Sequence, residues 1–233
     1  MNVLVIDVGG SHVKLLATGQ QTPRRFDSGP HLGPAQLVER VRETTADWSY
    51  DAISLGIPAP VGPGGPELDP GALGGGWVRF DFEKAFGKPV LVVNDAAMQA
   101  LGAYDGGRML FLGLGTGLGS ALVTDRVVMP LELGCLPYDR GETMADRLGR
   151  RGLKRHGEVA WQEAVREVVG VLRRAMAVDY ATLGGGNASL VAPLPDGARR
   201  GGNEDAFTGG FRLWEEEVVP HDVPPAAAWR VVR

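Results

Sequence analysis

The stretch "NVLVIDVGGSHVKLLAT", residues 2–18, decides the fold class of this chain. Apolar, β-branched residues lead to Asp7 and are followed by two glycines, which predicts a buried strand that enters a tight turn. The run "VKLLAT" predicts a returning strand, so the two form a hairpin. Successive backbone N–H groups in such a turn can converge on a phosphate, and Asp7 can orient a hydrated Mg²⁺. The alternative is a plain hairpin with Asp as a turn residue.

A second stretch, "RMLFLGLGTGLGSALVTD" at residues 108–125, repeats this order of strand, glycine turn and returning strand. Alternate glycines allow a close backbone approach to an anion, and Thr116 offers a hydroxyl. The stretch does not fit the dinucleotide fingerprint, because a strand and not a helix is expected after the glycines. The alternative is a glycine-rich hairpin without a ligand.

The rest of the chain alternates strands with helices, which predicts the α/β class. We expect helices over 34–48, 96–104 and 161–177, and a long loop over 58–76. The hairpin-then-crossover order occurs twice, so it predicts two related α/β lobes. These are residues 1–97 and residues 98–233, and they meet near residues 96–105 with a ligand cleft between them. The second lobe is expected to end in an extended Pro-rich tail.

Two further motifs lie where strands become helices. In "NDAAMQA", Asn94 and Asp95 are good N-caps, but a carboxylate at a strand end is also well placed as a general base for an alcohol. In "LGGGNA", residues 183–188, three glycines leave room for a flat ring or for a phosphate at a helix N-terminus. The alternative there is a tight connection.

Composition narrows the class of protein. The chain has 233 residues, a net charge of −4 and a single cysteine. The charge gives no overall attraction to nucleic acid or to an anionic membrane, and one cysteine excludes an internal disulfide and a multi-cysteine zinc site. No apolar run reaches the length of a membrane span, and the N-terminus lacks the pattern of a signal peptide. We therefore expect a soluble, cytoplasmic protein.

Taken in order, the motifs "DVGGSHVK", "NDAA", "LGTGLGSAL", Glu132-x-Gly134 and "LGGGNASLV" resemble the ROK family of sugar kinases and repressors. Within it the chain looks most like the polyphosphate glucokinases, up to about Glu215. The resemblance implies a two-lobed actin-like (ribonuclease H-like) ATPase fold with the active site in the interlobe cleft. Repressors of the family carry an additional N-terminal helix-turn-helix, so no nucleic-acid partner is expected here.

The resemblance also implies an activity and its residues. A phosphoryl group passes from ATP or polyphosphate to the 6-hydroxyl of a hexose, with Mg²⁺, and Asp95 is the base that takes the hydroxyl proton. Asp7 supports the metal through water. Asn94, Glu132 and Cys135 face the sugar, as Asp95 does. The donor phosphates face Gly9, Gly10, Ser11, Lys14, Gly115, Thr116 and Gly117. The nucleotide pocket is bordered by Gly184, Gly185, Gly186 and Asn187. A homodimer without structural zinc is the expected assembly.

The chain departs from the family pattern around the sugar. Cys135 stands where the family has His, Ala97 where it has Asp, and Ala145 where it has a second sugar-facing Glu. Asp146 or Glu142 are possible substitutes for that Glu. Sites that lose hydrogen-bond partners for a hydroxyl discriminate differently. Two alternatives therefore stay open: a kinase of a different sugar or polyol, and a non-catalytic sugar sensor on the same fold.

A basic run, "RLGRRGLKRHG", follows these positions at residues 147–157. Its cations could bind a polyanionic donor such as polyphosphate, or they could form a solvated helix face. The members of the run are Arg147, Arg150, Arg151, Lys154 and Arg155.

Overall fold

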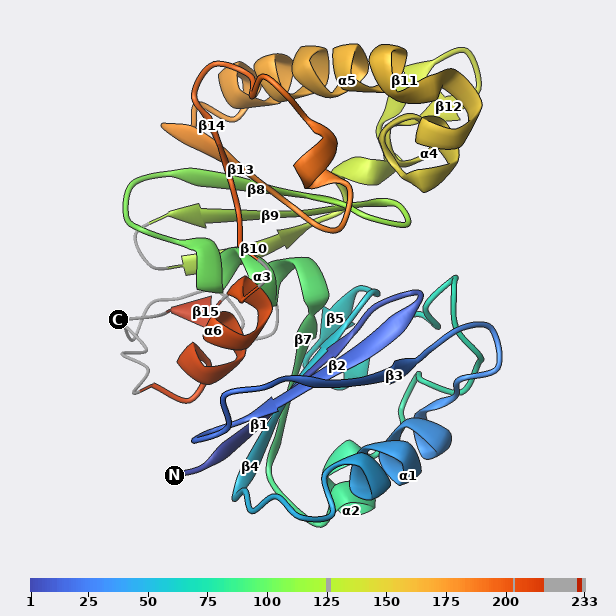
Figure 1. Ribbon diagram of the computed structural model, residues 1–233, viewed down its shortest axis with the longest axis vertical. Coiled ribbons are helices and arrows are strands. Elements are labelled where there is room, and N and C mark those ends of the chain that lie inside the picture. The colour runs from blue at the N-terminus through green and yellow to red at the C-terminus, as the bar shows by residue number, and fades with distance from the viewer. Residues whose placement is uncertain (125–126, 203, 216–229, 232–233) are drawn as a thin grey trace.

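The computed structural model describes residues 1–124, 127–202, 204–215 and 230–231. Figure 1 shows two β-sheets stacked along the long axis, with helices outside each sheet and a helical layer between them. This mixture of strands and helices confirms the predicted α/β class. Except for Arg230–Val231, the predicted Pro-rich tail lies outside the described residues.

The first sheet has the strand order β3-β2-β1-β4-β7. The predicted hairpin is present, with β1 antiparallel to β2 and Asp7 opposite Lys14, while β4 and β7 continue the sheet in parallel. All residues of β1 are buried because both faces of the strand are covered. The strands are β1 Val3–Val8, β2 His12–Ala17, β3 Arg24–Asp27, β4 Ala52–Ile57 and β7 Val90–Asn94.

The second sheet repeats this plan with the order β14-β13-β8-β9-β10-β15. Strands β8, β9 and β10 form an antiparallel meander, and β13 and β14 extend it in parallel from β8. The predicted echo of the first hairpin is therefore confirmed. The strands are β8 Met109–Leu114, β9 Leu118–Thr124, β10 Val127–Leu131, β13 Tyr180–Gly184, β14 Ala198–Arg200 and β15 Arg230–Val231.

Helices cover the outer face of each sheet. Helices α1 (Pro34–Thr44) and α2 (Phe82–Phe86) lie on the first sheet, where they share a core with Leu4 and Ile6 of β1. The long helix α5 (Arg150–Ala175) lies on the second sheet and buries an apolar stripe that includes Trp161, Val165 and Leu172. Between β10 and α5 the chain forms η1 Leu133–Cys135, β11 Pro137–Asp139, β12 Glu142–Thr143 and α4 Met144–Leu148.

Helices α3 (Asp95–Ala103) and α6 (Asp205–Arg212) fill the layer between the sheets. They pack closely because glycines stand at their contact: a Cβ on Gly102 would lie 1.8 Å from the Asp205 carbonyl oxygen. The first turn of α3 meets both sheets, since Ala96 lies against Gly119 of β9 and Asp95 lies near Gly56 of β4. The predicted lobe boundary at residues 97 and 98 falls inside this helix.

Several local predictions were wrong. The helix predicted over 161–177 begins at Arg150, with a kink where Gly157 has φ 78°, and the helix predicted over 34–48 ends at Thr44. The helix expected after Gly186 is only the 3-10 turn η2, Ala188–Leu190. The loop over 58–76 contains a small hairpin of β5 (Val61–Gly62) and β6 (Gly65–Pro66).

Elements absent from the sequence prediction include β3, α2, β10, α4, β14 and α6. They are short or polar: in β3, "RRFD", only Phe26 packs against the core, so no apolar run marks the strand. No helix within the described residues combines the length and the apolar character that crossing a membrane requires.

Candidate active site

The two glycine turns face each other across the lobes. A Cβ on Gly10 would lie 3.1 Å from Thr116 Oγ1 and 3.3 Å from the Cβ of Ala72, in the long loop over 58–76. Two hydrogen bonds fix the first turn: the Gly9 amide donates to the His12 carbonyl (2.9 Å), and Ser28 Oγ donates to the Gly9 carbonyl (2.6 Å). The structure thus brings together the turns predicted to hold the donor phosphates.

The glycines after β13 join the second turn. Gly185 has φ +80°, and a Cβ there would lie 2.7 Å from the Leu114 carbonyl oxygen, so the backbone approaches β8 closely. The Asn187 amide donates to the same carbonyl at 2.9 Å, and Asn187 Nδ2 donates to the Gly115 carbonyl at 3.4 Å. Gly186 borders open space. The predicted nucleotide residues therefore lie beside the predicted phosphate residues.

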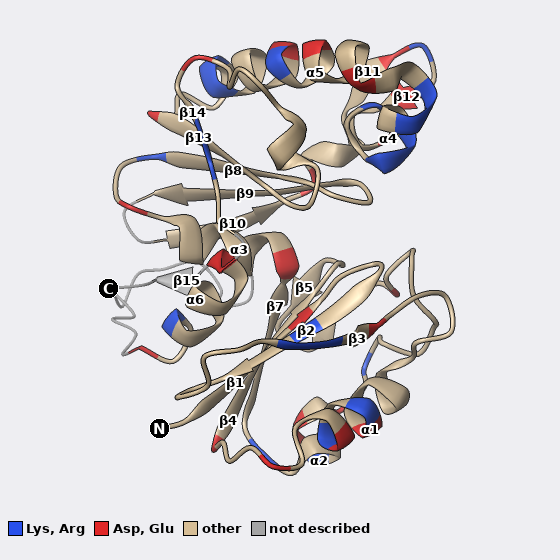
Figure 2. Cartoon of the chain, in the orientation of Figure 1, with Lys and Arg blue, Asp and Glu red and all other residues tan. Residues whose placement is uncertain are grey.

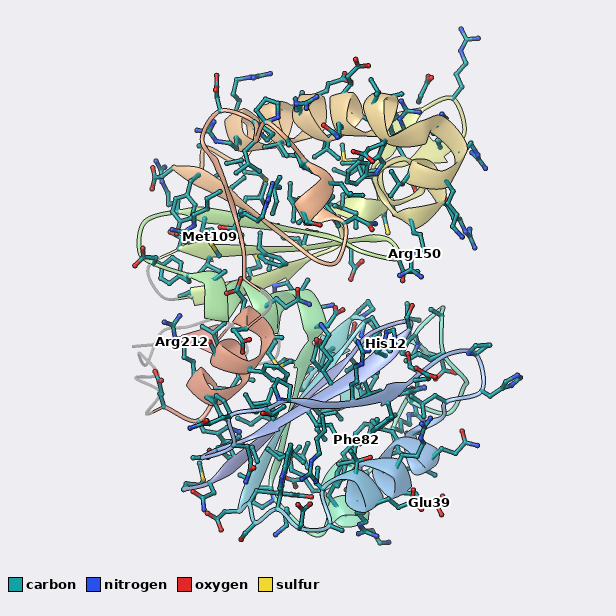
Figure 3. All side chains as sticks on the ribbon, in the orientation of Figure 1. His12, Glu39, Phe82, Met109, Arg150 and Arg212 are labelled. Atoms are coloured by element: carbon teal, nitrogen blue, oxygen red, sulfur yellow. The ribbon has the colours of Figure 1, made fainter. Side chains whose placement is uncertain are left out.

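Arg150 bridges the two turns and was not among the predicted site residues. Its backbone amide donates to the Gly115 carbonyl at 3.0 Å, and its Nη1 donates to Ser11 Oγ of the other lobe at 3.1 Å. Figure 3 shows Arg150 and His12 at the same end of the gap between the lobes. Gly149 makes this placement possible, because a Cβ there would lie 2.6 Å from the Thr116 carbonyl oxygen. The sequence signal was the basic run that starts three residues earlier, at Arg147.

The other cations of that run have different roles. Figure 2 shows basic residues gathered around α4. Arg155 pairs with Glu142, and Arg147 packs 5.4 Å from the Tyr138 ring centroid. Arg151 and Lys154 are exposed. Only Arg150 of the five has a hydrogen bond to a glycine turn within the part of the chain that the structure describes.

Asp7 lies buried at the end of β1 with one cation beside it. Burial raises the pKa of its carboxyl, and Lys14, whose Nζ lies 3.6 Å from Asp7 Oδ2, works against that rise. No cluster of three potential metal ligands is present among the described residues. A single carboxylate facing a phosphate site fits Mg²⁺, which proteins hold through one or two carboxylates, water and substrate phosphates.

Asp95, the first residue of α3, has a strongly raised pKa. Burial, together with the negative charges of Asp7 and Glu132, raises its pKa from 3.8 to about 7. The Ala96 amide donates to Asp95 Oδ1 at 2.8 Å and favours the charged form, but the other effects outweigh it. A carboxyl that titrates near neutrality at the start of a helix between two lobes suits proton transfer.

The side chain of Asn94, the neighbour of Asp95, makes two hydrogen bonds within the protein. Its Oδ1 accepts from the Ala97 amide at 3.1 Å and so caps α3, while its Nδ2 donates to the Ala59 carbonyl at 3.2 Å. The N-cap prediction is therefore confirmed for Asn94, and its contact with a sugar stays a prediction.

The segment with Glu132 and Cys135 lies against the second glycine turn. A Cβ on Gly134 would lie 2.9 Å from the Leu118 carbonyl oxygen and 3.2 Å from the Cβ of Ala145. Glu132 is exposed, yet partial burial of its carboxyl raises its pKa. Cys135 is exposed on the same 3-10 turn, η1. Ala145 also lies within 3.8 Å of a Cβ built on Gly117, so it borders the site.

No acid replaces the side chain absent at Ala145. Asp146 Oδ2 accepts from Thr143 Oγ1 at 2.8 Å and completes the cap of α4. Glu142 pairs with Arg155 and lies 3.7 Å from His156 Nε2. Both candidate substitutes are thus engaged in local structure and leave the edge of the site apolar.

A cavity of about 650 Å³ lies behind the first turn of α3, between β7, α3, β10 and the β5–β6 hairpin. Of the predicted site residues only Asn94 lines it. Its walls are mainly apolar side chains such as Leu91, Met98 and Val128. Because Asp7, Asp95, Glu132 and the glycine turns do not line it, we assign neither the sugar nor the donor to this cavity.

No protein-family model and no curated protein matches this chain. Solved structures do. An inorganic polyphosphate/ATP-glucomannokinase from Arthrobacter sp. strain KM superposes with a TM-score of 0.78 at 21% identity, over 89% of this chain and 96% of that one. A ROK hexokinase from Thermus thermophilus gives a TM-score of 0.66 at 21% identity, over 90% and 96% of the two chains. A ROK family glucokinase from Streptomyces griseus, in complex with glucose and AMPPNP, gives 0.68 at 14% identity, over 90% and 97%.

This chain has the fold of these sugar kinases. The predicted two-lobed, actin-like α/β architecture is therefore confirmed, and the turns described above occupy its interlobe edge.

Proposed function

We propose that the chain is a sugar kinase of the ROK family that transfers a phosphoryl group from ATP or polyphosphate to the 6-hydroxyl of a hexose. The observation that supports the proposal most is the Asp95 carboxyl at the start of α3, whose pKa is raised to about 7 by burial and by the negative charges of Asp7 and Glu132. The shared fold with kinases that act on sugars supports it.

In this mechanism Asp95 accepts the proton of the attacking hydroxyl as the new oxygen–phosphorus bond forms. The bond from that phosphorus to the bridging oxygen of the donor breaks, and ADP or a shortened polyphosphate leaves. Catalysis of phosphoryl transfer depends mainly on positioning and on neutralising charge. The backbone of the two glycine turns, Thr116 Oγ1, Lys14 and Arg150 would orient the donor phosphates and offset their charge. Mg²⁺, supported by Asp7 through water, would supply further neutralisation of the phosphate oxygens when bound.

One observation favours a hexose other than glucose as the acceptor. Ala145 borders the site without an acid to replace the family Glu, and Cys135 is a weaker hydrogen-bonding group than His. A pocket that offers fewer hydroxyl partners would accept a sugar with a different arrangement of hydroxyls.

The test is an activity matrix of hexoses against ATP and polyphosphate with Mg²⁺, run on the wild type and on Asp95→Asn. We expect turnover of at least one hexose with one donor and its loss in the variant. If no sugar turns over, or if the wild type and Asp95→Asn are equally active, the proposal is wrong. A broad panel also separates glucose from the alternative acceptors.

A further inference from the structure

A second cavity lies at the opposite end of α5 from the candidate active site. It encloses about 710 Å³ between the last turns of α5, the start of β8 and the loop of residues 193–196. Four arginines line it: Arg108, Arg166, Arg173 and Arg174. None of the predicted site residues contributes to its walls.

The charge of this cavity is unbalanced. Asp196 is the one acid among the lining residues, and Arg108 pairs with Asp179, outside the lining, at 2.9 Å. Among the described residues, the other three arginines have no carboxylate partner within ion-pair distance. Glu167, on the preceding turn, accepts from Tyr138 Oη at 3.1 Å and does not line the cavity.

Two of these guanidinium groups are held in place by neutral oxygen atoms. Arg166 Nη2 donates to the Ala192 carbonyl at 2.7 Å and to Gln162 Oε1 at 2.8 Å. Arg173 donates to the carbonyls of Asp196 and Asp179. Carbonyls fix the orientation of a guanidinium without cancelling its charge. The cavity therefore offers oriented positive charge before any ligand binds, which lowers the entropic cost of binding an anion.

Gly170 forms part of the wall between Arg166 and Arg174, which stand four residues before and after it on α5. Glycine in a helix interior is destabilising relative to alanine. Here neither conformation nor packing requires it: its φ is not positive, and the nearest atom to an added Cβ is Arg174 Nη1 at 3.5 Å. A side chain at this position would instead fill space between the arginines.

We propose that this cavity binds a small anion that carries phosphate groups. Guanidinium groups match phosphate oxygens in paired hydrogen bonds, and a group of them with one acid selects a ligand of two or more negative charges. A purely structural role, in which arginines tie the loop of residues 193–196 to α5, accounts for Arg166 and Arg173. It does not account for Arg174, whose side chain makes no hydrogen bond within the described residues, or for Gly170 between Arg166 and Arg174.

The test is calorimetric titration of the whole chain with tripolyphosphate, glucose 6-phosphate and inorganic phosphate, each at matched ionic strength. The three probes separate a polyphosphate, a phosphate ester and the free ion as sources of the same chemistry. In the Arg150→Ala background, donor binding at the active site should be about tenfold weaker, so titrations there reduce its contribution to the signal. We expect binding of at least one probe that persists in that background.

Two substitutions then locate the binding. Arg174→Ala removes a cation without a hydrogen-bonded partner, and Gly170→Leu fills the cavity while keeping every charge and a good helix former. Each should weaken the binding at least tenfold, whereas Arg151→Ala, an exposed arginine elsewhere on α5, should leave it unchanged. Thermal unfolding checks that both variants fold. Absence of binding to all three probes in Arg150→Ala, or wild-type affinity in folded Arg174→Ala or Gly170→Leu, would overturn the proposal. Neither result depends on kinase activity.

Discussion

The turn after β1 and the turn after β8 occupy the same place in two sheets of the same plan, but they differ in charge. The first carries Asp7, with Lys14 opposite, whereas residues 113–118 of the second contain no ionisable side chain. The cation next to the second turn comes from the following helix, as Arg150. The two lobes thus contribute differently to the proposed chemistry. The first supplies the charges of Asp7 and Lys14. The second supplies a backbone that can approach the donor closely, together with Arg150, which contacts the first lobe.

Asp95 stands at the junction of the two turns, and its substitution has the largest expected effect. Asp95→Asn keeps the size and the hydrogen bond from Ala96 but cannot accept the hydroxyl proton, so kcat should fall by about 10³-fold. Steady-state assays with the best hexose and donor measure this. A variant that retains more than a tenth of the activity would show that another group is the base.

The two turns themselves can be compared by single substitutions. Asp7→Asn removes the charge expected to support Mg²⁺, and we expect a loss of about 10²-fold in kcat/KM together with a higher Mg²⁺ requirement. Thr116→Ala removes one hydroxyl from the second turn and should cost about tenfold. Equal losses, with no change in the Mg²⁺ dependence for Asp7→Asn, would contradict the division of roles between the lobes.

The raised pKa of Asp95 also predicts a cost in stability. The unfolded carboxyl loses its proton near pH 4, but the folded one holds it to about 7, so the free energy of unfolding falls as the pH rises through that window. Asp95→Asn removes this loss. The variant should match the wild type near pH 4 and exceed it at pH 8 by on the order of 4 kcal/mol, as measured by urea unfolding. A constant difference at all pH values would place the pKa of Asp95 near its usual value.

Substitution of Arg150 tests whether this residue of α5 supplies the positive charge beside the second glycine turn. Arg150→Ala should raise the KM for the donor about tenfold and leave the KM for the sugar unchanged, because Arg150 contacts the two glycine turns that we propose hold the donor. Arg151→Ala is the matched control, one residue along the same helix and exposed. A change of similar size in the control would mean that the net charge of the helix, and not this contact, determines donor binding.

Cys135 gives the smallest expected effect and reports on the sugar side of the cleft. Cys135→His restores a hydrogen-bonding group on the turn after Glu132, which should lower the KM for glucose about threefold relative to other hexoses. Cys135→Ser is the control for size. If Cys135→His leaves both affinity and preference untouched, this turn does not contact the sugar.

The strongest features of the fold could be predicted from sequence because they are periodic and locally determined. The buried runs of β1 and β8, each ending in glycines, predicted both hairpins, and the stripe around Trp161 predicted the main part of α5. Elements such as α6 escaped prediction because Gly209 and Gly210 disfavour a helix locally. They are needed there for the close approach to Met98 and Val5.

For the candidate site, too, the residues in local motifs could be predicted and those that depend on tertiary contacts could not. Residues on the glycine turns and at the start of α3 belong to motifs, so their order along the chain identified them. Arg150 could be predicted only as one of five cations in a basic run. Its particular role depends on Ser11, which is 139 residues away in sequence and lies next to Arg150 only when the lobes meet. The engagement of Glu142 and Asp146 in local pairs is likewise a tertiary fact.

The most direct test of the central claim is the pH dependence of kcat/KM for phosphoryl transfer by the wild type. With Asp95 as the base, activity should rise about tenfold per pH unit on the acid side and level off above an apparent pKa near 7. A profile that is flat between pH 5 and pH 8, or one whose acid limb ends near pH 4, would contradict the account.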